Sequence, residues 1–85
     1  VVPVELAQHG DEKLVSRSQA KRVLAGLDRF TNILFDFAGV EMIGQAFADQ
    51  IFRVYKNQHP EIQILFINTN KNLDDMINRA LTARN

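Results

Sequence analysis

The side chains best suited to nucleophilic or metal chemistry are few in this sequence. Its two histidines, His9 and His59, lie far apart along the chain, each beside turn-forming residues. Its only serines are Ser16 and Ser18, and a nucleophilic serine needs a histidine within reach, for which only His9 is close in sequence. A zinc site needs three or four ligands at compatible positions, and no such spacing is present. We therefore predict surface histidines, no catalytic residue, no metal site and no cofactor.

Two aspartates and two glycines are the next candidates for chemistry. Asp36 falls toward the end of an apolar segment, where its carboxylate can accept hydrogen bonds from loop N–H groups. Asp49 stands four residues before Arg53, the spacing of a helical ion pair. Structural roles therefore explain both carboxylates better than an acid–base pair does. Gly39 and Gly44 lack the Lys-Ser/Thr that follows the second glycine of a phosphate-binding loop, and we interpret them as turn residues.

Four segments have the apolar content expected of strands, at residues 2–7, 13–15, 33–37 and 62–67. Turn-forming residues at 8–11 predict that the first two strands make a hairpin. Pro3 places the first strand at a sheet edge. The last two strands are apolar at nearly every position, which is typical of strands covered by helices on both faces.

Three helices are expected to connect and cover these strands. The first begins at a capping box formed by Ser16 and Gln19 and runs to about residue 28. The second spans residues 45–58 and ends before Pro60. Periodic apolar residues between 73 and 81 mark the third. The order β-β-α-β-α-β-α predicts an α/β fold, with a mixed four-stranded sheet (an N-terminal hairpin, the remaining strands parallel), helices on both faces, and the strands at 33–37 and 62–67 central or near-central.

The apolar positions of these elements predict a single core. Its expected members are Val23, Leu24, Leu27, Leu34, Ile51, Val54, Ile64 and Ile77. The second helix has a wide apolar arc with Phe52 and Tyr55 at its edge, and we favour full burial of both because a small domain needs its aromatic residues inside.

Composition limits the chain to one domain with no general affinity for polyanions. Its 85 residues carry ten basic and ten acidic side chains and no cysteine. The apolar runs are too short to span a bilayer, and the N-terminus lacks the pattern of a signal peptide. We expect a cytoplasmic domain without membrane contact. The missing initiator methionine indicates a processed chain or, as we favour, a piece of a longer one comprising residues 1–85.

Three stretches carry a resemblance to a known family. They read SRSQAKRVL, LFDFAGVEMIGQAFADQIFRVY and HPEIQILFINTN. Together they cover most of the chain, and they resemble the STAS-like domain of unknown function found in bacterial proteins. Gln50 departs from that family's usual Glu. The family looks like a distant version of true STAS domains, in which a Ser at the start of the helix after the central strand accepts phosphate. Here 44–47 reads Gly-Gln-Ala-Phe, without a hydroxyl, so that phosphorylation switch does not carry over.

The resemblance implies protein binding, often beside an ATP-binding or DNA-binding domain in the same chain. We therefore expect a non-catalytic regulatory interaction domain of a bacterial multidomain protein, with a partner that the sequence does not name. One alternative is a small anion- or nucleotide-binding module. A second is an accessory nucleic-acid-binding domain that uses the basic first helix, with Arg17, Lys21, Arg22 and Arg29 against Asp28. The lack of an aromatic residue among these charges makes nucleic acid unlikely as the partner.

A candidate binding surface follows from the predicted topology. Parallel strands point the same way, so the helices that follow them begin at one edge of the sheet, outside the carboxyl ends of the strands, where ligands of open α/β sheets bind. Three small polar turns converge there and offer the N–H groups of helix N-termini. The predicted surface comprises Ser16, Arg17, Ser18, Gly44, Gln45, Asn68 and Asn70. The competing interpretation is that these residues only cap helices, which explains Arg17 and Gln45 poorly.

Overall fold

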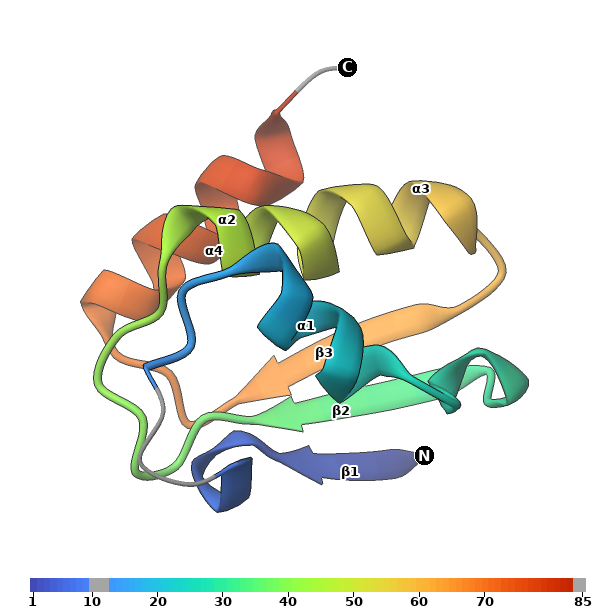
Figure 1. Ribbon diagram of the computed structural model, residues 1–85, viewed down its shortest axis with the longest axis horizontal. Helices are drawn as coiled ribbons and strands as arrows, with labels where there is room; N and C mark the ends of the chain where they lie inside the picture. The colour runs from blue at the N-terminus through green and yellow to red at the C-terminus, as the bar shows by residue number, and fades with distance from the viewer. Residues whose placement is uncertain (10–12, 84–85) are drawn as a thin grey trace.

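The computed structural model describes residues 1–9 and 13–83 as a parallel β-sheet with a layer of helices (Figure 1). The strands are β1 (Val2–Glu5), β2 (Asn32–Asp36) and β3 (Gln63–Ile67). The helices are α1 (Arg17–Leu24), α2 (Gln45–Asp49), α3 (Lys56–Gln58) and α4 (Lys71–Thr82), with 3₁₀ turns η1 (Leu6–His9) and η2 (Leu27–Arg29) and a π-helix, η3 (Gln50–Tyr55). Because α2, η3 and α3 follow one another without a break, they form a single helical rod.

The sheet has three strands in the order β1-β2-β3, and both pairings are parallel. The predicted N-terminal hairpin and fourth strand are therefore wrong within the described residues; Gly10 and Asp11 of the expected turn lie outside them. Residues 13–15 do not pair as a strand because their backbone groups have other partners. Val15 N–H donates to Lys13 O and to Gln19 Oε1, and Leu14 O accepts from Gly44 N–H. β1 lies at an edge as predicted, but β3 is an edge strand rather than a central one.

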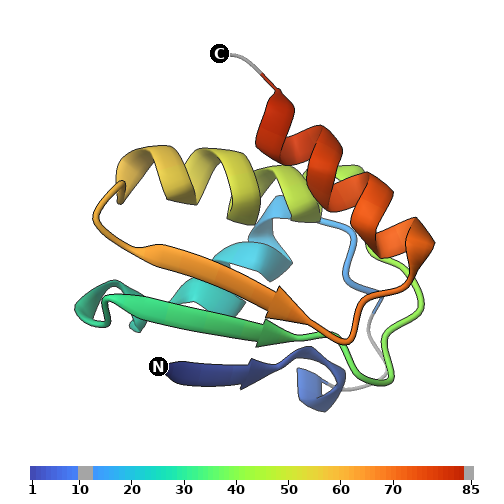
Figure 2. The same ribbon diagram turned by 180° about the vertical axis from the view of Figure 1, so that it is seen from behind.

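The helices lie on one face of the sheet, as the two opposite views show (Figures 1 and 2). Along β2, Ile33 and Phe35 are fully buried beneath them, whereas Leu34 points to the other face and is half-buried. On β3, Leu65 and Ile67 are 37% and 43% exposed on that open face. The prediction of helices on both faces is therefore wrong. The continuous apolar residues of β2 and β3 form the core on one face of the sheet and a partly apolar, uncovered surface on the other.

The core lies between the sheet and the helical layer. Of the predicted members, Val23, Leu24, Ile51 and Ile77 are buried, and Leu27 and Ile64 pack partly buried against the core. Leu34 and Val54 are only half-buried. Phe52 and Tyr55 are buried, as favoured. The Phe52 ring contacts Phe35 and Phe66 in edge-on geometry at 6.1 and 5.7 Å between centroids.

The helices follow the predicted ranges with two differences. α1 ends at Leu24 instead of continuing to residue 28, because Gly26 adopts a left-handed φ of 79° that helical backbone does not allow, and η2 follows separately. The rod from residue 45 to 58 has the predicted extent, but its middle is a π-helix. The wider π turn brings Gln50, Ile51, Phe52 and Tyr55 all into the interior.

Candidate functional site

The three polar turns do meet at the carboxyl end of the sheet, joined by the loop between β2 and α2. Gly44 N–H donates to Leu14 O at 2.8 Å, which links this loop to the segment that enters α1. Asn70 Nδ2 donates to Glu41 O at 2.9 Å, which links it to the start of α4. The residues around the helix starts therefore form one connected edge.

Gly44 is required at this edge by space and not by backbone conformation. Its φ of −80° suits any residue. A Cβ added there would lie 2.7 Å from Val15 Cα and 2.8 Å from Val15 O, closer than packing allows. Glycine thus lets the entry to α2 lie directly against the segment before α1.

The start of α1 is held by the predicted capping box. Ser16 Oγ accepts from Gln19 N–H at 3.1 Å, and Gln19 Oε1 accepts from Ser16 N–H at 2.8 Å. The Ser18 hydroxyl lies 3.1 Å from Ser16 Oγ. At α4, Asn70 Oδ1 accepts from Leu73 N–H at 2.8 Å. Capping therefore accounts for Ser16 and Asn70, and it engages a free N–H at each of these helix starts.

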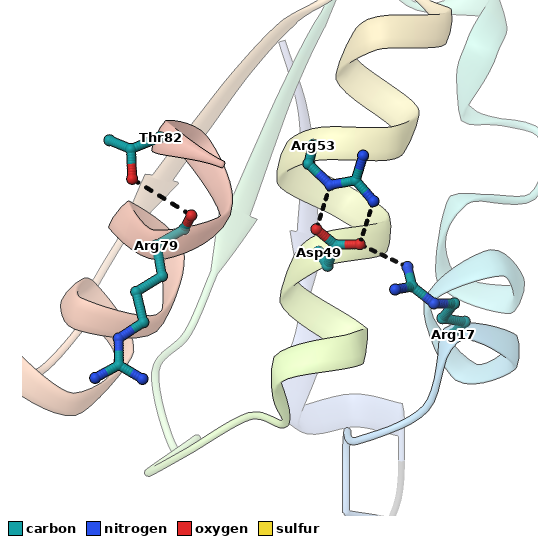
Figure 3. A network of polar contacts seen from close by, with 5 residues as sticks. All are labelled: Arg17, Asp49, Arg53, Arg79 and Thr82. Atoms are coloured by element: carbon teal, nitrogen blue, oxygen red, sulfur yellow. Dashed lines mark hydrogen bonds and ion pairs between the residues drawn. The ribbon is translucent and has the colours of Figure 1, made fainter. Parts of the chain in front are cut away.

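Arg17 has a partner within the chain. Its guanidinium donates to Asp49 Oδ2 at 2.7 Å, and the same carboxylate accepts from Arg53 in the predicted i,i+4 pair (Figure 3). The pKa of Asp49 is lowered to about 2, chiefly by the hydrogen bonds from Arg53 and then by those from Arg17. The Arg17 side chain is 48% exposed and that of Asp49 only 15%. Arg17, which the sequence places on the predicted binding surface, thus joins α1 to α2 through Asp49 while about half of its side chain stays exposed.

Arg79 lies apart from this network. Figure 3 shows its side chain on α4 directed away from Asp49. Gln45 lines a small cleft of about 50 Å³ between α2 and α4, together with Asp49 and Arg79. Gln45 is therefore brought near Asp49.

Asp36 and Asn68 form a second polar pair, where β2 and β3 end. Asn68 Nδ2 and Ala38 N–H donate to Asp36 Oδ1 at 2.8 and 2.9 Å, and these two bonds, that from Asn68 first, lower the pKa of Asp36. Asn68 has a left-handed φ of 60°, which asparagine tolerates. The predicted hydrogen bond between Asp36 and a loop N–H is thus confirmed. Asp36 and Asp49 have different partners, which fits two structural roles.

An apolar cleft of about 590 Å³, which we did not predict from the sequence, opens at the same edge. Its walls come from η1, from the segment before α1 and from the loop between β2 and α2. The lining residues are Leu6, Ala7, Lys13, Leu14, Val15, Gly39, Val40, Met42, Ile43 and Gly44. Met42 is 72% exposed at this cleft, and Val15 is half exposed. The one available signal was the apolar run Val40, Met42 and Ile43 in a segment expected only to be a loop.

A second cleft of about 420 Å³ lies between α1 and the helical rod. It is lined by the buried Gln50 and by Tyr55, whose ring lies 4.5 Å from that of His59 between centroids. Within the described residues the Tyr55 hydroxyl is buried without a hydrogen-bond partner, and burial, followed by the charges of Asp28 and Glu61, raises its pKa. Because the hydroxyl oxygen is inaccessible to solvent, it does not open onto the cleft.

Residues 1–9 and 13–83 contain neither a metal-binding cluster nor a membrane-spanning helix. No group of three or more histidine, aspartate or glutamate side chains lies close enough to hold a metal ion. No helix combines the length and the apolar character needed to cross a membrane.

Comparison with protein families gives one match. A family described as a STAS-like domain of unknown function matches residues 19–74, about two thirds of the chain. The chain belongs to this family. No curated protein and no solved structure matches it.

The match locates the candidate residues of this STAS-like domain relative to the family. It contains β2, β3, the helical rod and the loop with Met42 and Gly44, and it reaches Asn68 and Asn70. It begins at Gln19, so Ser16, Arg17 and Ser18 lie just before it. The exposed loop side of the cleft is thus part of the STAS-like region, and the α1 cap is an adjoining segment.

Proposed function

We propose that this STAS-like domain is a regulatory module that binds a protein partner at the carboxyl-end edge of its sheet. The exposed Met42 beside the apolar cleft carries the proposal. Covering a largely exposed methionine with a partner lowers the free energy of the complex, because apolar surface leaves water. The flexible thioether also adapts to different apolar surfaces. The partner would place an apolar side chain in the cleft.

The surroundings of the cleft have the character of a protein interface. Apolar groups form its centre, whereas Ser16, Ser18 and Asn70 supply polar groups at neighbouring turns. An apolar centre with a polar rim is the usual anatomy of protein–protein contacts. The loop is also held on either side of Met42, at Glu41 by Asn70 and at Gly44 by Leu14, so binding would order little additional backbone.

The proposal includes no catalysis, because the groups that could perform it already have structural partners. Ser16 and Ser18 contact each other at the α1 cap. Asp36 and Asp49 have lowered pKa values and stay ionised near neutral pH, which does not suit a general acid. His59 Nδ1 lies 3.6 Å from Glu61 Oε1, and His59 is far from both serines in the sequence.

The alternatives keep less support. An anion at the helix starts would compete with the caps at Gln19 and Leu73, and Arg17 is engaged by Asp49. The resemblance to regulatory STAS domains favours a protein partner, and we extend the proposal to a bacterial multidomain protein acting in the cytoplasm, with an ATP-binding or DNA-binding neighbour.

The test uses the immobilised domain to capture proteins from extracts of the cells that produce it. It compares the unchanged domain with two variants that each carry one substitution to aspartate. Met42→Asp places a charge at the apolar cleft. The control, Leu81→Asp, changes a side chain on α4 that is 39% exposed and lies outside the cleft. We expect a bound protein that is lost with Met42→Asp and retained with Leu81→Asp, as measured by quantitative mass spectrometry. If every bound protein responds equally to both substitutions, the cleft is not the binding site.

A further inference from the structure

The two outer edges of the sheet differ in their protection against pairing with another strand. β1 contains Pro3, which has no backbone N–H, and the charged Glu5, both typical of protected edges. β3, with the sequence QILFI, contains neither a proline nor a charged residue. Among the described residues β3 pairs only with β2. Its other side is therefore an unprotected edge.

The hydrogen bonds to β2 show which backbone groups of β3 point outward. Gln63 N–H donates to Thr31 O at 2.8 Å, and Ile67 O accepts from Phe37 N–H at 3.0 Å, so residues 63 and 67 face β2. Because the N–H and C=O groups of successive residues alternate in direction along a strand, residue 65 faces β2 as well. The N–H and C=O groups of Ile64 and Phe66 therefore point away from the sheet.

We propose that a second copy of this chain pairs with β3, antiparallel, about a two-fold axis at Leu65. In this register Ile64 lies opposite Phe66 of the second copy, and the symmetry repeats the pair on the other side of the axis. Each pair joins two outward-facing residues, which exchange both of their N–H···O=C bonds. Leu65 meets Leu65 of the second copy in a non-hydrogen-bonded position, where Cα atoms approach to about 4.5 Å. The interface is isologous, as a closed dimer requires.

The side chains fit the same register. Leu65 lies on the open face of both copies, while Ile64 and Phe66 lie on the helix face of both, so no apolar face is turned to the wrong side. Ile64 and Phe66 are only partly buried, although Ile33 and Phe35 beside them on β2 are fully buried. A strand beyond β3 would supply the missing neighbour and complete their burial.

Charge also allows a second copy as the occupant. β3 is uncharged, so the central pairs bring no like charges together. The antiparallel register directs Glu61, which precedes β3, toward the end of the second copy where α4 begins with Lys71. Glu61 would thus lie near that lysine and also near Asp74 in the first turn of α4, so this contact neither favours nor opposes the pairing. β3 is separated by β2 from β1, the strand that leads into η1 and the apolar cleft.

The test measures mass and amide exchange on the 85-residue chain. Sedimentation velocity over rising concentration is expected to show a monomer that becomes a dimer and stops there. Leu65→Lys, an exposed position, should abolish the dimer by placing two lysines opposite each other, whereas Met42→Lys and Leu34→Lys should leave it intact. Hydrogen exchange followed by NMR should show that the amides of Ile64 and Phe66 become protected as the dimer forms.

Several results would contradict the proposed dimer. A chain that stays monomeric, or that forms larger aggregates instead of a dimer, overturns the proposal. A dimer that survives Leu65→Lys also overturns it. So does a dimer that is lost with Leu34→Lys and leaves the amides of Ile64 and Phe66 exchanging freely, because such a dimer would pack through the open faces of the two sheets. Circular dichroism of Leu65→Lys confirms that loss of the dimer is not loss of the fold.

Discussion

Single polar residues in this domain serve mainly to hold elements together. Asp49 illustrates this, since its carboxylate joins α1, through Arg17, to the helical rod, through Arg53. Residue spacing alone predicted the pair with Arg53, because both residues are on one helix. The pair with Arg17 spans 32 residues and depends on how α1 packs, so local spacing could not show it.

Asp49 should make the stability of the domain depend on acid. Its folded pKa of about 2 lies below the ordinary value of 3.8, so its contribution is present above about pH 4 and is lost as the pH falls toward 2. Asp49→Asn should lower the free energy of unfolding at neutral pH by roughly 1 to 2 kcal/mol. It should also flatten the decline in stability between pH 4 and 2, as measured by urea denaturation. Arg53→Ala should cost more than Arg17→Ala; the reverse order would contradict the assignment of Arg53 as the stronger partner.

Tyr55 offers a substitution that should stabilise the fold. Its hydroxyl is buried without a hydrogen-bond partner in the described part of the chain, and an unsatisfied buried polar group costs about 1 to 3 kcal/mol. Tyr55→Phe removes that group and keeps the ring, so the free energy of unfolding should rise. Tyr55→Leu, which also removes the ring contact with His59, should lower it. A less stable Tyr55→Phe variant would mean that the hydroxyl has a partner in solution.

Elements were predictable to the degree that local signals define them. The capping box at Ser16, the rod over residues 45–58 and the cap at Asn70 all follow from spacing within one helix. Strand pairing was not predictable in the same way. Residues 13–15 have the apolar content of a strand, but the N–H of Val15 is engaged by the α1 cap and a tight turn, and Leu14 O accepts from Gly44. Only the folded arrangement shows this. The π-helix likewise has no sequence signal that we can identify.

The contact between Gly44 and Val15 gives a prediction at the scale of elements. Gly44→Ala would force the segment before α1 away from the start of α2, since the new Cβ meets Val15 backbone atoms below 3 Å. Overpacking of this kind costs about 1 to 3 kcal/mol. The control is Gly26→Ala, whose Cβ meets open space but whose φ of 79° costs about 1 kcal/mol. Thermal unfolding should rank Gly44→Ala as the more destabilising; equal effects would show that the contact is loose.

At the scale of the whole molecule, the domain places its helices on one side of a small parallel sheet (Figure 2). The β-α-β order predicted the parallel pairing of β2 and β3 and most of the core. The number of helical layers could not be read from apolar runs, because Leu34, Leu65 and Ile67 look like core residues in sequence but face outward. The predicted site was likewise partial. Polar turns marked the correct edge, whereas the cleft beside Met42 forms only when three separated segments meet.

The central claim, that this edge binds a protein partner, is tested most directly by site-specific photo-crosslinking. A photoreactive amino acid replaces Met42 in one sample and Leu81 in a second, and the cells that produce the domain are irradiated. We predict one protein linked to residue 42 and not to residue 81, with the link reduced when Gly44→Ala is also present because that change reshapes the cleft. Equal labelling at both positions, or no link from residue 42 at the partner's normal abundance, would contradict the proposed function.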